Sequence, residues 1–174
     1  MFKNLISIFF TLILVSCGEI IQPTLDTFKV EKDVFESGKS LISLPFDLHD
    51  LEEVTVDQNT LLIGVHGSNS RGYEWIYPLQ TLNDDDNIVA FFRWNDDACP
   101  APSVSSLLSL IDKKISDNPN LNKIILLGHS YGGLLVVAFA EAWEMDFPLQ
   151  IHSIAAPLAG MGIFTSICNY EVPN

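Results

Sequence analysis

Short apolar runs alternate with segments of helical periodicity from residue 61 onward, and this alternation constrains the fold more than any other feature of the chain. The runs are rich in Ile, Leu, Val and Phe and are bounded by polar or turn-forming residues, as in strands buried on both faces. Strands are expected at 61–65, 88–94, 123–127 and 150–155, and helices at 73–82, 103–116 and 132–145. Strand–helix–strand units predict an α/β fold class, a mostly parallel sheet sandwiched by helices.

The segment before this alternation has a different pattern. Strands are expected at 28–35 and 41–46, on either side of the turn-forming pair Ser37-Gly38. The acidic stretch 49–57 is expected to be a loop. The length of 174 residues, 48% of them hydrophobic, suffices for one domain with a sizeable core.

An export signal is expected at the N terminus. Lys3 precedes the apolar run 5–15, which is too short to span a bilayer comfortably. The run ends in Leu-Val-Ser-Cys, residues 14–17, and this tetrapeptide resembles the lipobox of bacterial lipoproteins. The resemblance implies that residues 1–16 are a signal peptide and that Cys17 is the lipid attachment site. An ordinary secretory signal and an N-terminal membrane anchor are the alternatives.

All of these alternatives export the chain. The lipoprotein resemblance implies a mature protein anchored to the membrane of the bacterial cell envelope through Cys17. Gly18 follows in place of the Asp that is linked to inner-membrane retention in enteric bacteria, which favours the outer membrane in a Gram-negative host. We expect residues 17–27 to be a tether and residues 28–174 to be the folded domain.

Charge and cysteine content restrict the partners. The chain has 9 Lys and Arg against 22 Asp and Glu, a formal net charge of −13 that excludes nucleic acid as an expected partner. The sequence has no metal-ligand cluster, phosphate loop or cofactor motif, so we expect no metal and no cofactor. The acidic runs 84–86 and 96–97 are expected to be solvated turns, with calcium binding as the alternative. Cys99 and Cys168 either form a disulfide in an oxidising compartment or remain unpaired.

The motif that carries chemistry is Gly128-His129-Ser130-Tyr131-Gly132, which fits G-x-S-x-G between an apolar strand and an apolar helix. A serine hydroxyl is a weak nucleophile and must be exposed, aimed and deprotonated. A sharp strand-to-helix turn presents it, and small residues at positions 128 and 132 let neighbouring chain pass close to that turn. The N terminus of the following helix favours negative charge beside the serine.

A second element, His66-Gly67-Ser68, follows the strand 61–65 at the same end of the predicted sheet. Acyl transfer develops an oxyanion that two backbone N–H donors normally stabilise. We expect these donors to be the N–H groups of Ser68 and Tyr131, with His66 and Gly67 forming the oxyanion loop.

These elements, with the later Ala155-Ala156-Pro157, resemble the lipase and esterase branch of the α/β-hydrolase superfamily over residues 61–160. The resemblance implies a serine hydrolase that cleaves a carboxylic ester of a small molecule or a lipid through an acyl-enzyme on Ser130. Amidases, peptidases and thioesterases use the same elbow, so the sequence leaves the scissile bond open.

The acid and base of that superfamily have no clear counterpart. The superfamily order is Ser, Asp or Glu, then His, and His152 is the sole histidine after Ser130. We expect His152 at the amino end of the sheet, far from the hydroxyl, together with Asp146. Glu171 is the remaining candidate acid. We therefore interpret the hydrolase core as incomplete at its C terminus, and the alternative is a lipid-anchored hydrolase-fold protein with degraded catalysis and a binding role.

Overall fold

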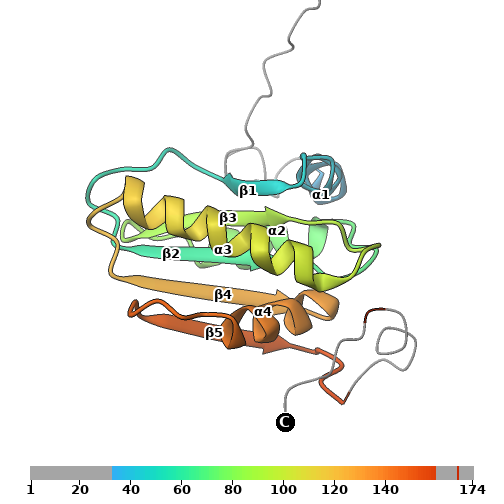
Figure 1. Ribbon diagram of the computed structural model, residues 1–174. Coiled ribbons are helices and arrows are strands. Elements are labelled where there is room, and N and C mark those ends of the chain that lie inside the picture. Colours follow the sequence, from blue (N-terminus) through green and yellow to red (C-terminus); the bar gives the residue numbers. More distant parts are fainter. Residues whose placement is uncertain (1–32, 160–167, 169–174) are drawn as a thin grey trace, which may run out of the picture.

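The computed structural model describes residues 33–159 and residue 168. The strands of this part form one sheet in the order β1-β3-β2-β4-β5. They are β1 (Asp47–Asp50), β2 (Thr60–Val65), β3 (Asn87–Arg93), β4 (Lys123–His129) and β5 (Leu149–Ile154). All neighbouring pairs are parallel except β1 with β3. The predicted α/β class with a mostly parallel sheet is confirmed (Figure 1).

Helices cover both faces of the sheet, and each face has its own core. The helices are α1 (Val34–Ile42), α2 (Tyr73–Thr81), α3 (Pro100–Asp117) and α4 (Tyr131–Glu141). The larger core lies under α3 and α4, on the near side in Figure 1, and includes Ile63 of β2 and Phe139 of α4. The second core, under α1 and α2, includes Leu62 of β2 and Trp75 of α2. Successive residues of β2 thus alternate between the two cores, as the pleat of a strand requires.

The four strands and three helices expected from residue 61 onward are confirmed, with shifts at their ends. α3 begins at Pro100, three residues earlier than expected, because the fixed φ of proline suits the first turn of a helix. α4 begins at Tyr131 and ends at Glu141, four residues earlier than expected. The apolar residue Trp143, which extended the helical pattern, packs instead against Phe139 with ring centroids 5.3 Å apart.

The two strands expected around Ser37-Gly38 are wrong within the described residues, because residues 34–42 form helix α1. Asp33 caps this helix, and its Oδ1 accepts a hydrogen bond from the Phe35 N–H at 3.0 Å. Residues 28–32 lie outside the described residues.

Gly38 is the reason that the local pattern misled. It marks a close contact between α1 and α2, where a Cβ on Gly38 would lie 2.3 Å from the backbone nitrogen of Tyr73. The glycine therefore serves helix packing and not a turn, and a tertiary contact of this kind leaves no local sequence signal.

The loop expected at 49–57 is wrong at its start, because His49 and Asp50 belong to strand β1. This strand pairs with β3 alone, antiparallel, with Asp47 opposite Arg93. An edge strand needs only one neighbour, so a short charged segment can fill the position.

Within residues 33–159 and 168, no helix is both long enough and apolar enough to cross a membrane. The expected signal peptide at 1–16, the tether at 17–27 and the proposed attachment site Cys17 lie outside the described residues, as does Glu171.

Candidate active site

Ser130 lies at the turn between β4 and α4, at the carboxyl edge of the sheet, the edge where the parallel strands end. Its φ of 54° and ψ of −121° form a combination that residues other than glycine rarely adopt. The Ser130 N–H donates to the Ile154 carbonyl at 2.9 Å, and the Ser130 carbonyl accepts from the Gly133 N–H at 2.9 Å. Hydrogen bonds on both sides thus hold this strained residue in place.

Two glycines allow the elbow to pack tightly. A Cβ on Gly128 would lie 2.4 Å from the Gly132 carbonyl oxygen. A Cβ on Gly132 would lie 2.4 Å from the carbonyl oxygens of both Val65 and His66. This is the close passage of neighbouring chain that the sequence predicts, and it seats the start of α4 against the end of β2.

The loop after β2 lies directly against the elbow. A Cβ on Gly67 would lie 2.9 Å from Cβ of Ser130 and 3.5 Å from its hydroxyl oxygen. The next residue, Ser68, is exposed. Tyr131, the first residue of α4, is buried and its hydroxyl donates to the Ala98 carbonyl at 3.2 Å. The structure therefore brings the His66-Gly67-Ser68 loop and the serine elbow together, although they are some sixty residues apart.

His66 is fully buried, and both nitrogens of its ring are engaged. Its Nδ1 lies 2.8 Å from the Gly67 carbonyl oxygen, and its Nε2 lies 3.0 Å from Nη1 of Arg93 and 3.3 Å from the Trp94 backbone nitrogen. Burial is the main cause that lowers the pKa of His66, and the positive charge of Arg93 acts in the same direction. His66 is therefore a structural member of the loop and is unsuited to accept the serine proton.

His129 and His152 lie together on the α2 side of the sheet. They line a hollow of about 440 Å³ between α2 and strands β4 and β5, with Trp75 and Leu127 among its other walls. The expected position of His152 at the amino end of the sheet is wrong, because it is the fourth residue of β5 and lies opposite Leu127. It is exposed, with its Nε2 2.7 Å from Nε2 of Gln150.

Among the described residues, the hydrogen bonds of Ser130 involve its backbone, so none of these residues is placed as a base for the Ser130 hydroxyl. Asp146 is exposed and lies between the end of α4 and the start of β5, at the amino end of the sheet as expected. No group of three or more His, Cys, Asp or Glu side chains in the described part of the chain could hold a metal ion.

Sequence reasoning missed Arg93 and Asp96. The carboxylate of Asp96 was expected in a solvated turn, but its side chain is only 14% exposed and lies 3.5 Å from Nη1 of Arg93. The Asn69 N–H donates to Oδ2 of Asp96 at 2.7 Å, so this carboxylate holds the loop that follows β2. The one available signal was an arginine at the end of an apolar run, Phe91-Phe92-Arg93.

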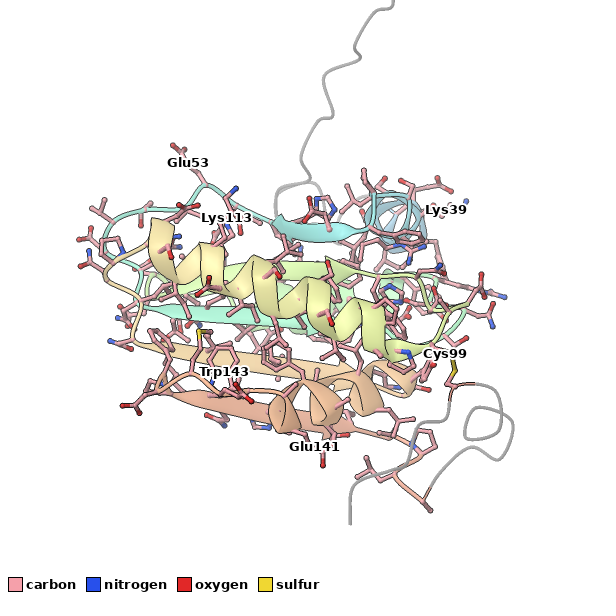
Figure 2. The ribbon with its side chains drawn as sticks, in the orientation of Figure 1. Lys39, Glu53, Cys99, Lys113, Glu141 and Trp143 are labelled. Carbon is pink, nitrogen blue, oxygen red and sulfur yellow. A yellow bond between two sulfur atoms is a disulfide. The ribbon has the colours of Figure 1, made fainter. Side chains whose placement is uncertain are left out.

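Cys99 and Cys168 form a disulfide, which resolves the alternative that the sequence left open. Figure 2 shows this bond beside Cys99, beyond the carboxyl edge of the sheet. Cys99 immediately precedes α3 and follows Ala98, whose carbonyl accepts the Tyr131 hydroxyl. The bond is therefore attached to a segment that contacts the first residue of α4.

No family model matches this chain, and no curated protein matches it. Two similar solved structures are both esterase B from Lactobacillus rhamnosis. The structure with a C4-C4 SN3 tributyrin phosphonate is 17% identical, with a TM-score of 0.43 over 59% of this chain and 40% of the esterase. The C6-C4 SN3 inhibited structure is 13% identical, with a TM-score of 0.48 over 83% of this chain and 60% of the esterase. The chain thus spans 40–60% of the length of these esterases.

Proposed function

We propose that this chain is a serine hydrolase of the α/β-hydrolase type that cleaves a carboxylic ester, with Ser130 as its nucleophile. The observation that carries the proposal is the backbone of Ser130, held at a φ of 54° between a parallel strand and a helix. Such a conformation costs about 1–3 kcal/mol and persists where the surrounding structure enforces it, as in nucleophile elbows. A serine without a catalytic role in a surface turn would not require this strained backbone conformation.

The proposed reaction begins when Oγ of Ser130 attacks the ester carbonyl carbon and loses its proton to a base. The carbonyl oxygen becomes an oxyanion, which the backbone N–H groups of Ser68 and Tyr131 stabilise. The proton passes to the alkoxide that leaves, and an acyl-enzyme remains on Ser130. Water then attacks the acyl-enzyme, releases the acid and restores the hydroxyl.

The position of Gly67 supports this assignment of the donors. A Cβ on Gly67 would lie 3.5 Å from the Ser130 hydroxyl oxygen, so the peptide that follows Gly67, which carries the Ser68 N–H, starts close to the reacting centre. The Tyr131 N–H belongs to the first turn of α4, where the helix dipole favours negative charge.

Glu171 remains the proposed acid of the catalytic site.

A fluorophosphonate probe, which phosphonylates activated serines, tests the proposal on the full natural chain. We expect covalent labelling that Ser130→Ala abolishes and that Ser106→Ala, at an exposed serine of α3, leaves unchanged. Hydrolysis of short-chain and long-chain esters, with matched amides and thioesters, then identifies the scissile bond. Absence of labelling that depends on Ser130 would overturn the proposal.

A second candidate function is that of a binding protein that retains a hydrolase fold. Two observations on the described residues favour it: the hydrogen bonds of Ser130 involve its backbone, and both ring nitrogens of His66 already have partners. This candidate predicts no labelling, no ester turnover, and no effect of Ser130→Ala on the biological role of the protein.

We also propose that the protein is exported and anchored by a lipid on Cys17, so that it meets its substrate at the cell envelope. The lipobox-like residues 14–17 support this part. Metabolic labelling of the bacterial host with a clickable fatty acid should modify the chain, and Cys17→Ser should abolish the modification. Labelling that persists in this variant would contradict the assignment of Cys17.

A further inference from the structure

The proposed oxyanion donor shares a peptide unit with a carbonyl whose direction the structure fixes. The peptide between Gly67 and Ser68 contributes the Gly67 carbonyl and the Ser68 N–H. The described residues contain no cis peptide bond, so these two groups lie in the peptide plane and point in opposite directions. The Gly67 carbonyl faces Nδ1 of His66 at 2.8 Å, and the Ser68 N–H therefore points away from the imidazole.

The neighbours of His66 decide which nitrogen of its ring carries the proton. Arg93 is a permanent donor, and its Nη1 lies 3.0 Å from Nε2 of His66. The Trp94 backbone N–H donates to the same nitrogen at 3.3 Å. Because both neighbours are donors, Nε2 must present its lone pair. The proton of the neutral ring therefore resides on Nδ1, which donates it to the Gly67 carbonyl.

The loop is held a second time on the other side of Ser68. The Asn69 N–H donates to Oδ2 of Asp96 at 2.7 Å, and Oδ1 of Asp96 lies 3.5 Å from Nη1 of Arg93. Arg93 thus contacts both groups that hold the loop. Its own position is fixed, because its Nε donates to the Ile42 carbonyl at 2.8 Å and its guanidinium lies 4.9 Å from the ring centre of Phe46.

We propose that Arg93 is a positioning residue of the oxyanion site: it fixes His66 as the neutral Nδ1–H tautomer, and His66 in turn fixes the direction of the Gly67–Ser68 peptide. The inference rests on the proposed function, because it concerns the donor of that reaction. If the peptide turned over, the Gly67 carbonyl would replace the Ser68 N–H as the group presented on the side away from His66. A carbonyl oxygen repels an oxyanion, so one of the two donors would be lost.

The first test needs no enzyme activity. Long-range proton–nitrogen NMR correlations of the histidine rings distinguish the two neutral tautomers, and His66→Asn assigns the His66 signals. We expect Nδ1–H with an unprotonated Nε2 for His66 at neutral pH. An Nε2–H tautomer or an imidazolium at neutral pH would overturn the inference, whatever the activity of the protein.

The same spectra of Arg93→Gln test the role of the guanidinium. Three charged groups act on the His66 ring: Arg93 of β3 and Asp96 of the following loop, together with Glu74 of α2. In Arg93→Gln the two carboxylates remain, and both favour the imidazolium. We therefore expect the variant to protonate His66 at a higher pH than the wild type does. An unchanged titration would contradict a role for Arg93.

The second test compares substitutions that keep or remove each hydrogen bond. The amide nitrogen of Asn can replace Nδ1 of His, whereas the Gln amide takes the place of Nε2. We expect His66→Gln to reduce kcat, or the rate of fluorophosphonate labelling, by about 10²- to 10³-fold, the usual effect of losing one oxyanion donor, with KM changed by less than about threefold. His66→Asn should recover part of this loss.

Arg93→Gln should reduce the rate in the same way, and Arg93→Lys, which retains a cationic donor, should recover part of it. Lys114→Gln is the matched control, because Lys114 is a comparably exposed cation paired with Asp50, between α3 and β1. It should lower thermal stability without the loss of kcat. Equal rates for His66→Gln and His66→Asn, or for Arg93→Gln and Lys114→Gln, would overturn the inference. Absence of labelling in the wild-type protein would overturn the proposed function, while the NMR tests would still decide the tautomer.

Discussion

Replacement of Gly67 by alanine should separate the geometry of the site from the stability of the fold. Among the described glycines, Gly72 is the one with a positive φ, so alanine at position 67 meets no left-handed backbone conformation. Its methyl group would instead lie 2.9 Å from Cβ of Ser130 and 2.9 Å from the His129 carbonyl oxygen. Carbon–carbon contacts are favourable at about 3.5–4.0 Å, so the loop and the elbow must separate by roughly 0.6 Å or more.

The separation has two consequences of different size. Overpacking of this kind typically costs about 1–3 kcal/mol. The catalytic effect is larger, because the methyl group would also lie 3.5 Å from the Ser130 hydroxyl, where an ester carbonyl must approach. Misplacement of reacting groups by about 1 Å can cost about 10²-fold in rate, and we expect a loss of that order or greater.

The assay measures the second-order rate of fluorophosphonate labelling together with the midpoint of thermal unfolding. Gly64→Ala is the matched control: its methyl would also approach another residue to 2.9 Å, but that residue is Trp75 of α2. Both variants should lose stability, and Gly67→Ala alone should lose labelling by about 10²-fold. Equal labelling of the two variants would refute the packing of the oxyanion loop against Ser130.

Three further predictions concern stability. Ser130→Gly should raise the free energy of unfolding by up to about 2 kcal/mol in urea titrations, because glycine adopts a φ of 54° without strain, and a decrease would contradict the strain. Because the pKa of His66 is lowered in the folded protein, the unfolded chain binds a proton at the His66 ring more readily. The contribution of His66 to the free energy of unfolding should be fully present above the ordinary histidine pKa of 6.5 and should decrease below it, by at most about 1.4 kcal/mol per pH unit. His66→Asn should show a shallower pH dependence of stability, and an equal slope would argue against a depressed pKa. Replacement of both Cys99 and Cys168 by alanine removes a disulfide that joins residues 69 positions apart, and should lower the free energy of unfolding by about 4 kcal/mol. A reducing agent should produce the same decrease in the wild-type protein and no decrease in the double variant.

Local sequence signals predicted the strands and helices whose apolar pattern is visible in consecutive residues. Strand β2 could be placed because both of its faces are apolar, and the turn at Ser130 because an apolar strand and an apolar helix flank its glycines. Helix α1 was predicted wrongly, because Gly38 looks like a turn residue until α2 packs against it. The expected position of His152 was also wrong, because β5 begins at Leu149 and His152 is its fourth residue.

The sequence by itself determined the α/β class, the order of strands and helices from residue 61 onward, and the serine at the elbow, because hydrophobic periodicity and glycine placement act over a few neighbouring residues. The tertiary structure alone decided how the His66-Gly67-Ser68 loop is held. β2 and β3 pair with Val65 opposite Phe92, so the next residues along each strand, His66 and Arg93, become neighbours at the carboxyl edge. That pairing depends on strand register, and a residue's partner on another strand is fixed only when the sheet has formed.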